Sequence, residues 1–157
     1  MPPDPQDDLF QFASPDDSSG FVLWQVNNLW QRRIRQALAE VGLTHVQFVL
    51  LACLGWLTEK GDQPVTQVRL AAQARTDVMM TSKVLRALED MGLVERHEHP
   101  ADPRARSLRV TPAGREMVYK AVRLVDAVDR GFFAALGQGE DDFRAGLLRL
   151  RDGADRV

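Results

Sequence analysis

The side chains best suited to chemistry in this sequence lie at the start of one expected helix, over about residues 77–91. Two adjacent methionines stand there among polar residues that can reach base edges or phosphate groups: Asp77, Met79, Met80, Ser82 and Lys83. Methionine can contact the methyl group of thymine, and the N-terminal residues of a recognition helix read base edges in the major groove. The alternative is an ordinary surface helix, but adjacent exposed methionines are costly on a solvated face. We therefore expect this segment to read DNA.

Arginines occupy a loop between two segments, 93–97 and 107–110, whose alternating pattern is typical of paired strands. The loop contains Arg104 and Arg106, with Asp102 two residues before Arg104. An arginine at a loop tip can enter a minor groove, where negative potential is concentrated. Asp102 can hold the loop by accepting hydrogen bonds from backbone amides or from an arginine. A solvated charged hairpin is the common alternative; after a helix-turn-helix pattern, we expect a DNA-binding wing.

The charge distribution is compatible with DNA binding but does not by itself predict it. The formal net charge is −2, but the first 20 residues contain five acidic residues and no basic ones, so the rest of the chain carries a formal charge of +3. We expect residues 1–19, rich in Pro, Asp and Ser, to form a disordered acidic tail. The mildly basic remainder supplies candidate phosphate contacts, which set affinity and its salt dependence: Arg75, Lys83, Arg86 and Arg106.

Capping signals predict the helices of the first half of the chain. Ser18 or Ser19 can cap a helix that runs to about residue 41. Thr44 and Gln47 form a capping box, in which each side chain accepts from the other residue's backbone amide. The nearly all-apolar helix that follows, over about 48–60, should be the central helix of the core.

Further signals predict the DNA-binding elements and the helices after them. Thr66 can cap a short helix, and a turn around residues 74–75 separates it from the helix at 77–91. The inner stripe of that second helix is expected to contain Val84, Leu85, Leu88 and Met91, with Val78 or Thr81, and Gly92 is expected as a left-handed cap. Thr111 caps a helix to about 135, and a last helix covers about 140–150. The expected fold class is mainly α with a small β-hairpin wing (α+β), a winged helix-turn-helix.

Apolar surface at both ends of the chain predicts a dimer. The first helix is apolar on more than one side, and the last helices carry aromatic and leucine stripes. Interlocked terminal helices from two chains would bury both surfaces; the alternative is a monomer that packs them internally. We therefore expect residues 20–43 and 112–152 to form a helical dimerisation region, and residues 44–111 to form the DNA-binding lobe.

Over about residues 21–150 the sequence resembles the MarR family of winged-helix regulators. The runs that carry the resemblance are Leu88-Glu89-Asp90-Met91-Gly92-Leu93-Val94-Glu95-Arg96, Asp102-Pro103-Arg104-Ala105-Arg106 and Leu108-Arg109-Val110-Thr111-Pro112-Ala113-Gly114. The resemblance implies an obligate homodimer on a palindromic site and a small-molecule or oxidant-sensing pocket between the dimer helices and the DNA lobe. By position, Arg104 is the wing-tip arginine and Asp102 its partner. The Met79-Met80 pair is not a generic family choice.

Effector-binding residues are harder to identify. The first helix carries tryptophans among polar residues, and together with a histidine further along they could line an apolar pocket with polar anchors: Trp24, Asn28, Trp30, Arg33 and His45. An aromatic carboxylate or a phenol would suit such a site. The alternative is that the tryptophans belong to the core and the dimer interface. Cys53 lies in an apolar run, where a thiol is usually inert, and no cysteine stands near the start of the first helix, where the family's peroxide sensors carry theirs.

Other classes of protein are disfavoured. The sequence shows no phosphate-binding glycine loop and no nucleophile elbow, and three histidines with one cysteine make a poor metal site. We expect no enzyme activity, no cofactor and no metal. The single cysteine fits a cytoplasmic, reducing compartment, and no apolar run approaches the ~20 residues that span a bilayer.

The sequence thus predicts a homodimeric DNA-binding regulator, a repressor that a small aromatic or phenolic effector relieves. The main alternative is a winged-helix protein-interaction module without DNA binding.

Overall fold

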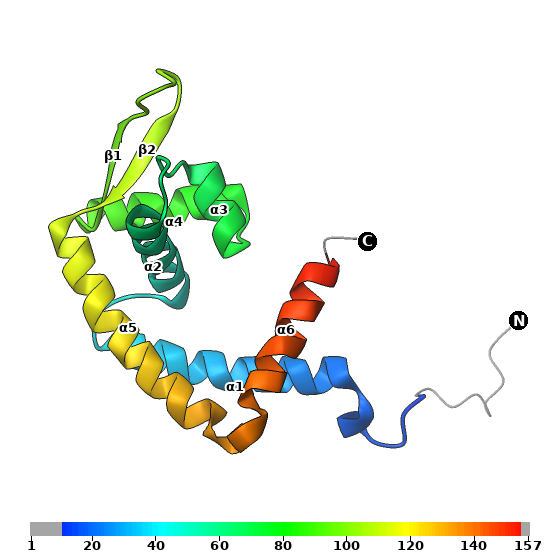
Figure 1. Ribbon diagram of the computed structural model, residues 1–157. Helices are drawn as coiled ribbons and strands as arrows, with labels where there is room; N and C mark the ends of the chain where they lie inside the picture. The colour runs from blue at the N-terminus through cyan, green and yellow to red at the C-terminus, as the bar shows by residue number, and fades with distance from the viewer. Residues whose placement is uncertain (1–10, 155–157) are drawn as a thin grey trace, which may run out of the picture.

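The computed structural model describes residues 11–154, in which a lobe carrying a hairpin stands on two long helices, α1 and α5 (Figure 1). The elements follow in the order η1 (Pro15–Asp17), α1 (Ser19–Ala39), α2 (His45–Lys60), α3 (Gln67–Ala74), α4 (Val78–Asp90), β1 (Val94–Glu98), β2 (Arg106–Val110), α5 (Pro112–Phe133), η2 (Ala134–Gly139) and α6 (Glu140–Ala154). The expected fold class, mainly α with a hairpin wing, is confirmed.

Local capping explains why the helices begin where they do. The hydroxyl of Thr44 accepts from the Gln47 amide at 3.2 Å, and the Gln47 side chain accepts from the Thr44 amide at 2.9 Å, as the capping box predicts. The hydroxyls of Ser18, Thr66 and Thr111 cap α1, α3 and α5 by accepting a backbone amide three residues ahead, without the reciprocal contact. Since each of these contacts spans only three residues, the sequence suffices to locate them.

The core centres on α2. Its four leucines at positions 50, 51, 54 and 57 are buried, and they belong to one cluster with Leu85 and Leu88 of α4 and Leu108 of β2. Burial of each such side chain contributes on the order of 1.5–3 kcal/mol. The cluster continues to Ile34 of α1 and to Val125 of α5, so the lobe and the long helices share a core.

One expected member of the α4 stripe lies elsewhere. Met91 is 43% exposed, because it is the C-terminal cap of α4 and the chain turns at Gly92, which has a φ of 72°. Leu93 is buried instead. Thr81 completes the inner face, and its hydroxyl donates to the carbonyl of Asp77 at 2.8 Å.

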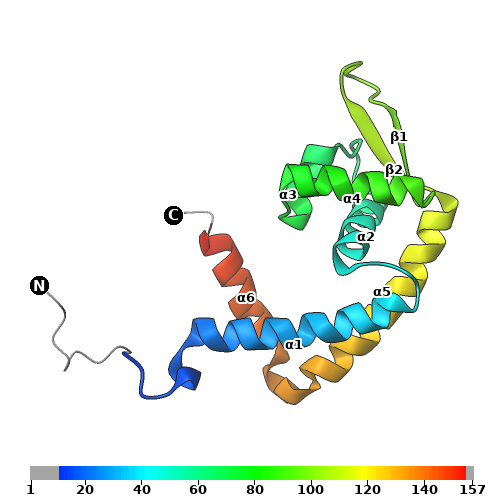
Figure 2. The same cartoon turned by 180° about the vertical axis from the view of Figure 1, so that it is seen from behind.

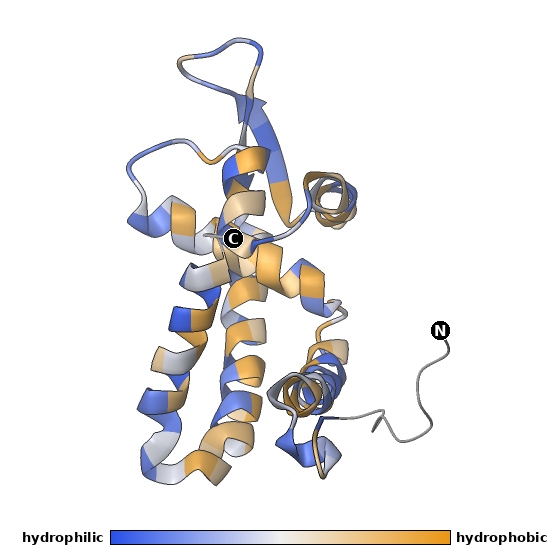
Figure 3. Cartoon of the chain, turned by 90° about the vertical axis from the view of Figure 1, so that its right-hand side faces the viewer, coloured by the Kyte–Doolittle hydropathy of each residue, from blue (hydrophilic) through white to orange (hydrophobic). Residues whose placement is uncertain are grey.

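The hairpin is fixed to the helices at its base. β1 and β2 pair antiparallel, with Val94 opposite Val110 and Glu98 opposite Arg106, and they project from the helices as a largely hydrophilic extension (Figure 3). Leu108 forms a further bridge to Val65. At the start of α5, a side chain at Gly114 would collide with the carbonyl of Leu93, so this joint requires glycine.

The two ends of the described chain are less enclosed. α6 turns back from the far end of α5 and has no buried residue (Figures 1 and 2). η1 lies inside the segment for which the sequence predicts disorder, because Ser14 and Asp17 form a local capping box. The remainder of the expected tail, residues 1–10, lies outside the described residues. No helix within residues 11–154 is both long and apolar enough to cross a membrane.

Candidate nucleic-acid interface

α3 and α4 form a helix-turn-helix whose turn depends on Arg75. This residue caps α3 in the left-handed conformation, with a φ of 51°, which is uncommon for a residue other than glycine. Asp77 then caps α4, and its carboxylate accepts from the Met80 amide at 2.7 Å. The carboxylate of Asp77 is thus engaged in holding the start of α4.

The first turn of α4 exposes mostly apolar surface. Met79 is 83% exposed, Val78 is 49% exposed and Met80 is 43% exposed. Ser82 is half-buried, and its hydroxyl accepts from the Arg86 guanidinium at 3.4 Å. Lys83 is exposed. The structure therefore brings the residues assigned to base readout onto one short stretch of helix.

The wing tip has the arrangement that the sequence predicts. The carboxylate of Asp102 accepts from the Arg104 amide at 2.9 Å, and its backbone carbonyl accepts from the Ala105 amide at 3.1 Å. Of the two hydrogen-bond partners predicted for the Asp102 carboxylate, a backbone amide or an arginine side chain, the structure shows the backbone amide. The Arg104 side chain is exposed at the tip, while Arg106 lies 3.9 Å from the Glu98 carboxylate in an exposed ion pair.

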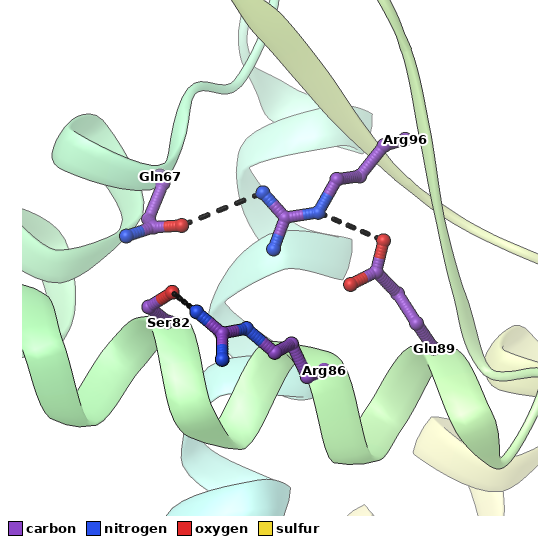
Figure 4. A network of polar contacts seen from close by, with 5 residues as sticks. All are labelled: Gln67, Ser82, Arg86, Glu89 and Arg96. Atoms are coloured by element: carbon purple, nitrogen blue, oxygen red, sulfur yellow. Dashed lines mark hydrogen bonds and ion pairs between the residues drawn. The ribbon is translucent and has the colours of Figure 1, made fainter.

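A polar network joins the hairpin to both DNA-binding helices, and the sequence reasoning missed it (Figure 4). The guanidinium of Arg96, on β1, donates to the Glu89 carboxylate on α4 at 2.8 Å and to the Gln67 amide oxygen on α3 at 3.4 Å. Arg96 and Glu89 both lie in a run that carries the family resemblance, but neither spacing nor periodicity links them to Gln67. The network ties the wing to the recognition helix.

The five residues expected to form an effector site do not converge. The Trp30 indole donates to the Asp129 carboxylate at 2.8 Å and meets the His45 ring edge-on at 5.2 Å. The guanidinium of Arg33 instead lies 5.2 Å from the centre of the Phe132 ring. Trp24 and Asn28 line a separate shallow groove along α1. The structure thus joins Trp30 and His45, keeps Arg33 on the neighbouring turn of α1 against α5, and separates Trp24 and Asn28 from them.

A more apolar groove lies between α2 and α5, at the base of the wing. It has a volume of about 430 Å³, and its lining includes Cys53, Trp56, Val110, Val118 and Val122. Arg115 and Glu59 also line it and are joined by an ion pair at 3.4 Å. Burial raises the pKa of the Cys53 thiol, which keeps it protonated and poorly nucleophilic.

Comparisons with known proteins agree with this geometry. Residues 39–128 match the family model of the ArnR1-like winged-helix domain. The HTH-type transcriptional regulator YdcH of Bacillus subtilis is 43% identical over 140 residues, which are 89% of this chain and 94% of that protein. The HTH-type transcriptional repressor Rv2887 of Mycobacterium tuberculosis is 30% identical over 121 residues, which are 77% and 84% of the two chains.

Solved structures give the same picture. The structure of Rv2887, a MarR family protein in complex with salicylic acid, aligns with a TM-score of 0.63 at 28% identity and covers 85% of this chain and 96% of that one. The Staphylococcus aureus MepR–DNA complex aligns with a TM-score of 0.76 over 90% and 99% of the two chains. At 19% identity, the likeness to MepR concerns the fold alone.

Proposed function

Since this chain belongs to the MarR family of winged-helix transcriptional regulators, we propose that it is a homodimeric repressor that binds a palindromic operator and leaves it when a small aromatic effector binds. Like its relatives, the chain is a DNA-binding regulator and not an enzyme. Repression, the palindrome and relief by a ligand are the finer parts of the proposal. A cytoplasmic location belongs to it too, because the protein has to reach chromosomal DNA.

The observation that carries the proposal is that two carboxylates of the lobe hold its backbone while the side chains beside them are exposed. Asp77 and Asp102 are both engaged with backbone amides and hold the start of α4 and the wing tip. The side chains that these contacts position, Met79 and Arg104, are exposed. The two carboxylates thus hold the backbone, while Met79 and Arg104 are exposed toward the solvent, where they can meet a major groove and the flanking minor groove.

Exposed apolar surface on the terminal helices supports the homodimer. α1 exposes Leu23, Trp24 and Leu29, and α6 exposes Leu147, Leu148 and Leu150. A monomer would leave these faces in water, at a cost that a second copy removes. We propose that residues 20–43 and 112–152 form this interface, that residues 44–111 form the DNA lobe and that residues 1–19 form an acidic tail outside both.

For the effector we propose the groove between α2 and α5. Its apolar walls suit a planar ring, and Arg115 at its edge can exchange Glu59 for a ligand carboxylate or phenolate. The relative Rv2887 was solved with salicylic acid, an aromatic carboxylate. The cluster of Trp30 and His45 is the second candidate, since it also combines aromatic faces with polar groups, whereas the surface around Trp24 and Asn28 would be covered in the dimer.

Fluorescence anisotropy tests the proposal directly. We would measure binding to duplex DNA from upstream of the protein's own gene and to a shuffled duplex, at two salt concentrations. Wild type should prefer the upstream duplex, with affinity falling steeply as salt rises. Arg104→Ala should weaken binding by about 1–3 kcal/mol. Arg130→Ala, which removes the same charge from the far end of α5, should not, provided that its chromatographic mass matches that of the wild-type dimer.

The outcome that overturns the proposal is binding of wild type to neither duplex at low salt. That result would favour a winged-helix module that contacts another protein. If Arg104→Ala instead binds the upstream duplex as tightly and specifically as wild type, the wing does not contact DNA, but the protein is still a DNA-binding regulator.

A further inference from the structure

We propose that Met79 and Met80 recognise the C5-methyl groups of thymine, so that each operator half-site presents thymines where the first turn of α4 enters the major groove. This inference rests on the proposed DNA-binding function and specifies the chemistry of base readout. Its consequence is that affinity depends on a methyl group of the DNA rather than on a hydrogen-bonding edge at these positions.

Neither methionine belongs to the hydrophobic core or to the partly buried side chains packed against it. α4 buries Thr81, Leu85 and Leu88 against the core, while Val78, Met79 and Met80 lie on its exposed side. The side-chain amide of Gln67 donates to the carbonyl of Val78 at 3.3 Å, so the start of α3 lies against this turn. The next residue of α3, Val68, is also exposed. The apolar surface therefore spans both helices of the helix-turn-helix.

The polar side chains at the start of α4 are already hydrogen-bonded within the protein, so they are poorly placed to read a base. The only carboxylate there, on Asp77, accepts the Met80 amide, and Ser82 is half-buried with its hydroxyl bonded to Arg86. The first cation of α4 is Lys83, at the start of the second turn. Guanine is usually read by two hydrogen bonds from Arg or Lys, and adenine by Asn or Gln. Val78, Met79 and Met80 can make neither contact.

Thymine is the base that offers a matching group. Its C5-methyl is the one apolar feature among the base edges of the major groove, and a flexible thioether side chain adapts readily to its position. DNA is the occupant that fits this surface because Lys83 and Arg86 follow on the same helix and the Arg104 wing projects from the same lobe.

Replacement of thymine by uracil isolates the methyl group. We would amplify the upstream region with dTTP or with dUTP and measure the affinity of the full-length protein for both duplexes, with shuffled duplexes of each kind as references. Burial of one methyl group is worth about fourfold in affinity. One methyl contact from each protomer therefore predicts about 15-fold weaker binding to the uracil duplex.

Two variants assign the effect to the methionines. Met79→Ala combined with Met80→Ala should bring the thymine-to-uracil affinity ratio close to one. Met91→Ala, which removes a methionine of equal exposure to Met80 from the other end of α4, should keep the ratio of wild type. Circular dichroism and chromatographic mass would confirm that both variants fold and assemble as wild type does.

The possible results separate failure of methyl readout from failure of the proposed function. Equal and specific binding of wild type to both duplexes refutes methyl readout and leaves the proposed function standing. A ratio that survives in the double-methionine variant assigns the effect to DNA shape and also refutes it. Binding of wild type to no duplex above the shuffled references defeats the proposed function itself, and this inference with it.

Discussion

Replacement of Arg96 by methionine should uncouple the wing from the recognition helix. Arg96 is the one residue of β1 whose side chain bonds both Glu89 of α4 and Gln67 of α3 (Figure 4). Methionine keeps most of the aliphatic volume and removes the guanidinium. The expected result is a less stable lobe in which Arg104 is no longer held at a fixed distance from α4.

The size of the stability loss follows from the geometry. The Arg96–Glu89 contact is short, at 2.8 Å, and both side chains are largely but not fully shielded, with 29% and 26% of their surface exposed. A buried hydrogen bond to a charged group is worth about 1.5–3 kcal/mol, and an exposed ion pair about 0.2–1 kcal/mol. The 3.4 Å contact with Gln67 adds little. We expect Arg96→Met to lower the free energy of unfolding by about 1–2 kcal/mol.

Urea denaturation measures this loss, and DNA titration measures the loss of coupling. Arg109→Met is the matched control, because Arg109 is an exposed arginine on the other strand of the same hairpin. Its effect on unfolding should stay within about 0.5 kcal/mol. In the Arg96→Met background, the DNA-binding penalty of Arg104→Ala should fall well below its value in wild type, because the wing tip is already misplaced.

A double-mutant cycle tests whether the stability loss comes from the contact between Arg96 and Glu89. Arg96→Met and Glu89→Gln should together destabilise by less than the sum of their separate effects, since they remove the same interaction. The reasoning is refuted if Arg96→Met leaves the free energy of unfolding unchanged and the full Arg104→Ala penalty persists beside it.

Two further predictions concern the dimer and the junction of the long helices. Leu150→Glu on α6 should shift the protein to a monomer in analytical ultracentrifugation, whereas Val68→Glu, at almost equal exposure (67% against 66%) but in the DNA lobe, should leave the dimer intact. Burial, followed by the charge of Arg35, lowers the pKa of His45 below 6.5, while Asp129 opposes the shift. The unfolded state therefore binds the His45 proton more readily than the folded state. The free energy of unfolding should fall as pH drops from 6.5 through the folded-state pKa of His45, and His45→Gln should flatten that dependence in urea titrations.

Features set by nearest neighbours along the chain could be predicted from the sequence. The Thr44–Gln47 box, the caps at Thr66 and Thr111 and the Asp102 contact with the Arg104 amide each span a few residues, so residue type and spacing determine them. The same locality explains the single turn of η1, in which Ser14 and Asp17 cap each other.

Features that join distant segments could not be predicted in the same way. Arg96 meets Gln67 across 29 positions, and no periodicity relates a strand to a helix in another part of the chain. Helix geometry explains why Trp24 and Asn28 lie apart from Trp30 and His45. Trp24 and Trp30 are six residues apart, which at 100° per residue places them on different faces of α1. Asn28, four residues after Trp24, shares its face instead.

The position of the groove between α2 and α5 gives the proposed effector a physical route to the DNA. Val110 lines the groove and pairs with Val94 at the base of the hairpin, while Arg115 lines it from the first turn of α5. A ligand there touches the joint between the wing and the dimer helices. It can shift the lobe only by the difference between its affinities for the two arrangements. Contacts with Val110 and Arg115, which lie at the wing base, should therefore matter more for release from DNA than contacts with α2, whose leucines are buried in the core.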